Sequence, residues 1–383
     1  MTYIIDCFKN LIEQYPTWAQ LRPFLESWEG GRLRVIDCGS DLHLIRYDKG
    51  SSNFSIASTG WFRSVVWDGA TNRPLCVGPP KATETEPESH DSLTYEEFYE
   101  GVMINAFLKD GHIRLVTRSK LDATGTFYSP RSFQSLLMDT GMTLDSIQAL
   151  LTQKNAQFVS LLLQHPEHRI VSRITEPRAI LIHTGSVAAN GSVTFQEEVP
   201  RQEKPADVPL EQWARSIAEA KGWQHQGLVI KDGQGSRYRL RSSAYTMVRT
   251  LRGDSPRIEA RFLKLRQQQL METYGFYYPE EKQLMDQLEL LVRQLTQQLY
   301  NFYVCVHIKH SIKFVDLPPY WKTHVYALHS YYLGTLKERR FFIRKQEVIQ
   351  YMNNLPIPRM LHLFKQRLPT SSEPEQSPTL AQQ

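Results

Sequence analysis

The sequence is poor in cysteine, and the few cysteines do not form a recognisable set. Its 383 residues include four, at positions 7, 38, 76 and 305, with no CxxC pair among them. This pattern argues against a disulfide framework or a zinc site. It favours a reducing compartment such as the cytoplasm, or a virion if the chain is viral.

Long apolar runs and a strong charge of one sign are also missing. No stretch approaches the roughly 18 consecutive apolar residues of a membrane helix, so we expect no membrane partner. The first residues, MTYIIDCFKN, lack a basic segment and a long apolar run, so no secretory signal is expected. The formal net charge of +5 permits a basic groove but does not by itself predict nucleic-acid binding.

What the sequence has in quantity is short β-rich runs. Runs such as LRVIDCG, LHLIRYD, FRSVVWD, HIRLVTRS, RAILIHTGSV and RYRLRSS alternate with turns through the first 250 residues. Two windows, 129–153 and 210–223, have helical patterns. We therefore expect a mixed α+β domain over 1–252. Within it, the polar, acidic segment ETEPESHDS (84–92) is expected to be a loop.

The character of the chain changes near residue 256. Leucines at 284, 288, 291, 295 and 299 follow helical spacing and predict a long amphipathic helix. Further helical patterns lie near 322–338 and 345–353, which predicts an all-helical domain over 256–368. The tail 369–383 is rich in Pro, Ser and Gln and is predicted to be disordered.

Five stretches, in order, carry a family resemblance that covers nearly the whole chain. They are FRSVVWDGATNRPLCVGPPKA (62–82), EEFYEGVMINAFLKDG (96–111), DGHIRLVTRSK (110–120), FVSLLLQHPEHRIVSRI (158–174) and WQHQGLVIKDGQGSRYRLRSSAY (223–245). Together they resemble the motifs of the phage-type ATP-dependent RNA ligases, which are covalent nucleotidyltransferases. The resemblance implies an ATP-grasp-like RNA/DNA ligase domain with antiparallel sheets, followed by a helical C-terminal domain. It also implies ATP and Mg²⁺ as cofactors if activity is retained, and it makes a viral source plausible.

The chain departs from the family where the chemistry is concentrated. The family's nucleophile motif, K-x-D-G, is matched by Phe98, Glu100 and Gly101, so the lysine is missing. Two family glutamates are replaced by Leu162 and Gln226, which removes ligands for a divalent ion. A phenyl ring has no lone pair with which to attack phosphorus. We therefore expect a pseudoenzyme with no catalytic residue and no metal site.

Positive charge persists at the positions that the family uses for phosphate. The expected nucleotide- or RNA-binding residues are Arg63, Lys81, Arg118, Gln226, Arg239 and Arg241, the last two in place of family lysines. Arg239 and Arg241 alternate on one strand and so share a face. The alternative for each cation is ordinary solvated strand charge. For Phe98 and Tyr99, the alternatives are a base-stacking platform and simple strand packing.

Three functions remain open at this point. The preferred one is a non-catalytic protein that binds RNA or a nucleotide. The second is an active ligase with a relocated nucleophile, for which Lys109, Lys120 and Lys231 are nearest in sequence. The third is an interaction scaffold with an empty cleft, which would bind protein partners through the helical domain and the acidic loop. Histidines at 307 and 310, and at 324 and 329, are expected to be packing residues rather than a metal site.

Overall fold

The computed structural model of the protein describes residues 1–84 and 93–366. They belong to two compact units, Met1–Thr250 and a second unit that begins at Leu251. The sequence placed this division near residues 252–256. The predicted disordered tail (369–383) and most of the predicted acidic loop (84–92) lie outside the described residues.

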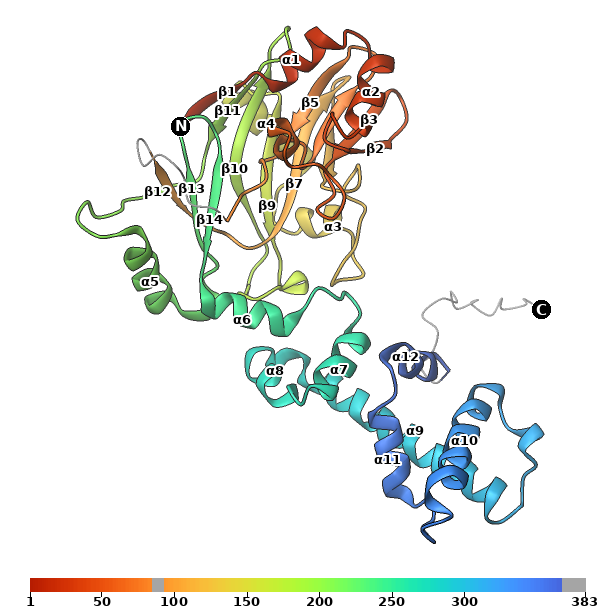
Figure 1. Cartoon of the computed structure of the whole chain (residues 1–383). Coiled ribbons are helices and arrows are strands. Elements are labelled where there is room, and N and C mark those ends of the chain that lie inside the picture. The colour runs from red at the N-terminus through yellow and green to blue at the C-terminus, as the bar shows by residue number, and fades with distance from the viewer. Residues whose placement is uncertain (85–92, 367–383) are drawn as a thin grey trace, which may run out of the picture. The chain divides into compact units, whose positions relative to one another are not determined.

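The largest sheet of unit 1 has six antiparallel strands (Figure 1). In spatial order they are β1 (Thr2–Ile5), β11 (Val193–Glu197), β10 (Arg178–Val187), β9 (Phe158–Gln164), β7 (Val102–Lys109) and β8 (His112–Thr117). Every residue of β9 is buried, as the continuous apolar run FVSLLLQ predicts for a strand covered on both faces. Side chains alternate along it: Val159, Leu161 and Leu163 pack with two helices, and Phe158 belongs to a second cluster on the other face.

The helices on the first face are α3 (Phe133–Met138) and α4 (Leu144–Lys154). They contribute Leu136, Leu137, Ile147 and Leu151 to that cluster. The sequence predicted helix over 129–153, and the structure divides this window in two. Gly141, with φ +79°, lies in the turn between the helices, a backbone conformation that glycine adopts at little cost.

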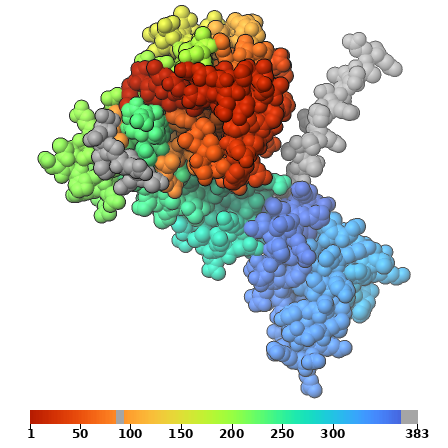
Figure 2. Space-filling view, turned by 45° about the horizontal axis from the view of Figure 1, so that its top comes forward, coloured from red at the N-terminus to blue at the C-terminus, as the bar shows by residue number. Residues whose placement is uncertain are grey.

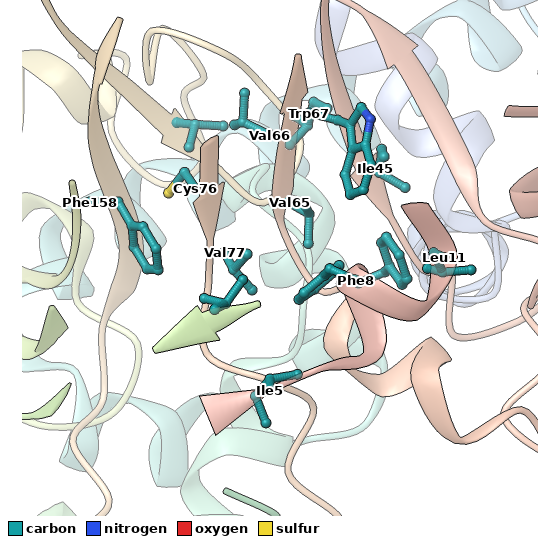
Figure 3. Close-up of a cluster of buried hydrophobic side chains, with 14 of the residues drawn as sticks. Ile5, Phe8, Leu11, Ile45, Val65, Val66, Trp67, Cys76, Val77 and Phe158 are labelled. Carbon is teal, nitrogen blue, oxygen red and sulfur yellow. The ribbon is translucent and has the colours of Figure 1, made fainter. Parts of the chain in front are cut away.

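A four-stranded antiparallel meander contributes to the core on the other face. Its strands are β2 (Arg34–Asp37), β3 (Leu42–Arg46), β4 (Val65–Asp68) and β5 (Arg73–Val77). Figure 3 shows side chains of β4 and β5 between Phe158 of the large sheet and Phe8 of an N-terminal helix. The aromatic rings of Phe8, Phe62 and Trp67 are in contact there, which makes this cluster the most aromatic part of the core.

The N-terminal helices were not predicted. Helix α1 (Cys7–Gln14) and helix α2 (Trp18–Glu26) occupy a region in which only strands and turns were expected. Helix α1 is only eight residues long, although Phe8, Leu11 and Ile12 follow helical spacing, and α2 contains Pro23. The N-terminal elements form part of the surface of unit 1, coloured red in the space-filling view (Figure 2).

A third sheet, also antiparallel, carries two of the predicted site residues, Arg239 and Arg241, on one strand. Its order is β12 (Arg201–Gln202), β6 (Thr94–Glu97), β13 (Gly227–Lys231) and β14 (Arg237–Arg241). Helix α5 (Leu210–Lys221) precedes β13, and helix α6 (Ser243–Arg252) follows β14 directly (Figure 1). Short 3-10 turns lie at Ala57–Trp61, Pro166–His168 and Gly222–Gln224. Unit 1 is therefore a mixed α and β structure with antiparallel sheets, as predicted.

The regular elements described in unit 2 are helical. They are α7 (Ile258–Gln267), α8 (Met271–Tyr277), α9 (Lys282–His307), α10 (Pro319–Tyr331), α11 (Lys345–Asn353) and α12 (Ile357–Lys365), with short turns at Pro279–Glu281, Phe314–Asp316 and Tyr332–Leu336. Helix α9 confirms the predicted long amphipathic helix, with Leu288, Leu295 and Leu299 buried. Leu284 is exposed, however, and Met285 and Val292 complete the buried face.

Candidate functional site

A cavity of about 320 Å³ lies within unit 1, between the large sheet and the sheet that contains β6, β13 and β14. One side is apolar. Met103 and Leu162 face it from β7 and β9, and Ile182 and Val199 pack beside them. The other side is basic and is formed largely by β14 and by the loops after β3 and β5. Such a division suits a ligand with an apolar part and an anionic part.

The turn between β6 and β7 forms the floor of the cavity and contains Phe98, Glu100 and Gly101. Glu100 is buried, and its carboxylate accepts hydrogen bonds from the backbone N–H groups of Ile170, Val171 and Ser172 at 2.9–3.3 Å. A Cβ at Gly101 would come within 2.5 Å of the Leu163 carbonyl oxygen, so the close approach of the strands requires glycine. Glu100 is therefore a buried residue that ties this turn to residues 170–172.

Phe98 lies at the entrance to this turn. Its backbone N–H donates to the carbonyl oxygen of Gly227 at 2.9 Å, and its side chain lines the cavity. The guanidinium carbon of Arg241 lies 5.6 Å from the centre of the phenyl ring, within cation–π range. The ring therefore covers a cation of the cavity wall.

The basic side contains more cations than were predicted from the sequence. The cationic side chains that line the cavity are Lys49, Arg63, Lys81, Arg118, Arg237, Arg239, Arg241 and Arg249. Among the described residues, no carboxylate lies within ion-pair distance of Arg63, Arg237 or Arg241. Buried guanidinium nitrogens of Arg118, Arg237, Arg239 and Arg241 have no acceptor in the described part of the chain.

Burial and the crowding of positive charge lower the pKa of several of these cations. Burial lowers the pKa of Lys49, and the nearby guanidinium groups of Arg239 and Arg118 lower it further. Burial likewise lowers the pKa of Arg63 and of Arg241. The charged forms are therefore destabilised relative to water, and an anion bound in the cavity would relieve that cost.

Gln226 ends the loop before β13 and is also directed into the cavity. It is 6% exposed, and its side-chain carbonyl oxygen has no hydrogen-bond donor among the described residues. A buried, unsatisfied amide oxygen is costly unless a ligand or water supplies a donor. Gln226 is therefore a candidate ligand contact.

All of the predicted site residues line this one cavity. They are Arg63, Lys81, Phe98, Glu100, Gly101, Arg118, Gln226, Arg239 and Arg241. Lys49, Arg237 and Arg249 were missed. The strand period gave a signal for Arg237, because it is two residues before Arg239 and shares its face. Nothing comparable marked Lys49, in a loop, or Arg249, on helix α6.

The three lysines considered as relocated nucleophiles do not line the cavity. The Lys109 ammonium lies 3.0 Å from a carboxylate oxygen of Asp68. Lys120 is exposed beyond the end of β8. Lys231 is buried between the carboxylates of Glu96 and Glu197.

The histidines that are near each other in the sequence of unit 2 are not the ones that contact each other in the structure. The rings of His307 and His329 stack with centroids 3.7 Å apart, joining the end of α9 to α10. His324 contacts the hydroxyl of Tyr351 at 2.9 Å. Across residues 1–84 and 93–366, no cluster of three or more His, Cys, Asp or Glu is arranged to hold a metal ion.

The basic and aromatic segment KERRFFIRK (337–345) of unit 2 is turn and irregular structure up to Arg344. Phe341 and Phe342 are more than half exposed, whereas Ile343 is buried and holds the segment in place. No helix in the described part of the chain is long and apolar enough to cross a membrane.

Comparisons with known proteins give a limited answer. No protein-family model matches the sequence. No curated protein matches it either. Among solved structures, form 1 of an archaeal ATP-dependent RNA ligase is similar at 11% identity and a TM-score of 0.35, over 74% of this chain and 73% of that chain. Form 2 is similar at 12% identity and a TM-score of 0.36, over 94% of this chain and 81% of that chain. Structures similar to this chain thus include ATP-dependent RNA ligases, at a level that carries no argument about what this chain binds or does.

Proposed function

We propose that unit 1 is an RNA-ligase-like nucleotidyltransferase domain that binds a phosphate-bearing ribonucleotide, free or at the end of an RNA, without reacting with it. The observation that carries the proposal is the set of eight cationic side chains around one cavity. Three of them, Arg63, Arg237 and Arg241, have no carboxylate partner among the described residues. These three side chains are half-buried, and a cation withdrawn from water is normally paired, so a ligand that supplies the anion explains the cluster best.

The apolar side supports a ribonucleotide rather than a simple anion. Val229 of β13 and Leu162 of β9 both line the cavity, and Tyr99 packs against the apolar cluster that includes Leu162. A base could lie against these side chains while arginine forks bind phosphate oxygens. Phe98 supplies an aromatic face in place of an amine, which favours binding without covalent attachment.

The test is equilibrium binding of ATP, a 5′-phosphorylated RNA and the same RNA with a 5′-hydroxyl to the full-length chain. We expect the phosphorylated RNA to bind about tenfold more tightly than the hydroxyl form, a difference of about 1.4 kcal/mol. Affinity should fall steeply with salt, as phosphate contacts require. ATP that competes with the RNA would identify one shared site.

The matched variants are Arg237→Gln and Arg73→Gln. Arg237 lines the cavity, whereas Arg73 is exposed on β5 and does not. We expect about a tenfold loss of affinity in the first, since a hydrogen bond to a charged group contributes about 1.5–3 kcal/mol. The second should bind as the unmodified chain does. Equal affinities in the two variants, or no ligand-induced rise in melting temperature, would favour an interaction scaffold instead.

A second candidate, an active ligase, is favoured by one observation. Lys49 and Lys81 line the cavity, and burial among arginines lowers the pKa of Lys49, which increases the fraction of neutral amine. The Lys49 nitrogen would attack the α-phosphorus of ATP, forming an N–P bond as pyrophosphate leaves and the amine proton passes to solvent. Incubation with α-labelled ATP, followed by a denaturing gel, tests this. We expect no labelled band; a band lost in Lys49→Arg would establish the ligase.

A further inference from the structure

The resemblance to RNA ligases implies Mg²⁺ together with ATP, and the cavity residues do not fit this ion. Mg²⁺ is usually held by one or two carboxylates in addition to phosphate oxygens. Three carboxylates line the cavity, those of Glu96, Glu97 and Glu100. Each already has nitrogen donors from the chain itself.

Glu96 and Glu97 are engaged by basic side chains. The Lys231 ammonium lies 2.6 Å from Glu96, and both groups are almost fully buried. Glu97 has the Lys221 ammonium at 3.0 Å and the His225 imidazole at 3.5 Å. These two side chains lower the pKa of Glu97 to about 2, so its charge is present and already compensated.

Glu100 is engaged by the backbone. Both of its carboxylate oxygens accept N–H donors from residues 170–172. A metal ion at these oxygens would displace three hydrogen bonds and would leave buried amides unsatisfied. Glu100 therefore does not offer an oxygen to a cation.

The two positions at which the family has further glutamates are also unsuitable. Leu162 is part of a buried apolar cluster, and Gln226 has a neutral amide oxygen. The eight cations outnumber the three carboxylates by five, so a divalent cation entering the cavity would be repelled. Arginine guanidinium groups, by contrast, donate two parallel hydrogen bonds to phosphate.

We propose that the cavity binds the polyphosphate group of its ligand in the metal-free form, with arginine guanidinium groups in the place of the divalent ion. This proposal rests on the proposed function, because it specifies the chemical form of the ligand at the same site. The polyphosphate belongs to a ribonucleotide, either free in solution or at the 5′ end of an RNA. Mg²⁺ would compete with the arginines for the same oxygens.

The experiment measures the Kd of ATP for the full-length chain in excess EDTA and in excess Mg²⁺, at equal ionic strength. Since Mg²⁺ cancels part of the negative charge of ATP, we expect binding in EDTA to be about tenfold tighter. Weaker binding in EDTA than in Mg²⁺ would overturn the proposal and leave the proposed function intact. Binding of neither ATP nor a 5′-triphosphate RNA in either condition would overturn both. A 5′-triphosphate RNA, measured in parallel, identifies which source of polyphosphate binds more tightly.

A second test substitutes Gln226 by glutamate, the residue that the RNA-ligase motif has at this position. Gln226→Glu is nearly isosteric and adds a carboxylate that no described donor engages. We expect its affinity for ATP in EDTA to fall about tenfold and Mg²⁺ to recover part of the loss. Gln234→Glu, which adds the same charge at an exposed position after β13, should not change either value. An unchanged Kd in Gln226→Glu would place the phosphates away from this residue and would overturn the proposal.

Discussion

Two arginine clusters, one buried in unit 2 and one half-buried in unit 1, are constructed in opposite ways. In unit 2, Arg252 and Arg261 are 5% exposed, and both contact the carboxylate of Glu281, at 2.5 and 2.8 Å. The hydroxyl of Tyr274 donates to the same carboxylate at 2.7 Å. In the cavity of unit 1, Arg63 and Arg237 have no such carboxylate within the described chain. The first cluster thus has its own carboxylate, whereas Arg63 and Arg237 of the second have none at ion-pair distance among the described residues.

The comparison separates two uses of the same side chain. A paired, buried arginine stabilises its own fold, because removal of its partner leaves an uncompensated charge. An unpaired one reduces the stability of the free protein and recovers that cost when an anion binds. Substitutions in the two clusters should therefore move stability in different directions.

The largest effect is expected in unit 2. Glu281→Gln removes the carboxylate shared by Arg252 and Arg261 and should lower the free energy of unfolding by about 3 kcal/mol. Urea unfolding followed by circular dichroism measures this. Glu272→Gln, an exposed carboxylate on α8, is the matched control and should change stability little. Equal stability in the two variants would contradict the comparison.

In unit 1 we expect a smaller change in stability, of opposite sign. Arg237→Gln removes one cation from the crowded cavity and should leave the melting temperature of the free chain unchanged or raise it, by the equivalent of about 1 kcal/mol at most. Arg261→Gln, the same exchange in the paired cluster, should lower it. Thermal unfolding without ligand decides between these outcomes. A loss of stability in both variants would mean that the cavity arginines also serve the fold.

The smallest effect is a pH dependence. Because the His225 imidazole and the Lys221 ammonium lower the pKa of Glu97 to about 2, from an ordinary value of 4.5, this residue stabilises the folded chain above the ordinary value. The contribution is lost as the pH falls from about 4.5 to 2. The Glu97→Gln variant lacks this carboxylate, so its stability should fall less between pH 6 and pH 3 than that of the unmodified chain. Unfolding curves at pH 6 and at pH 3, compared between the two proteins, measure it.

The sequence predicted more of the site than of the fold around it. Strand period alone placed Arg239 and Arg241 on one face, and the ordered motifs brought Phe98, Arg63 and Gln226 into the same group; these line one cavity. Their roles as ligand contacts stay predictions. Lys49 and Arg249 could not be found in this way, because a loop and a helix bring them to the cavity through tertiary packing.

The features of the fold that were not predicted from the sequence have similar causes. Helix α1 is short, so the helical spacing of Phe8, Leu11 and Ile12 gave only a brief signal, and α2 contains a proline; packing of Phe8 against the sheets stabilises α1. The structural role of Glu100 could not be predicted from the residues next to it in sequence. Its actual partners, the amides of residues 170–172, are about 70 residues away in sequence, and no local rule identifies them.

The same carboxylate has a consequence for the kinetics of binding. Glu100 joins the turn after β6 to residues 170–172, and Ser172 and Arg173 are in turn hydrogen-bonded to Gln224. The floor of the cavity is thus tied together from three separate segments before any ligand arrives. A preorganised site loses little conformational entropy on binding. The association rate should then be governed by electrostatic steering toward the arginines, so that salt slows arrival more than it hastens release.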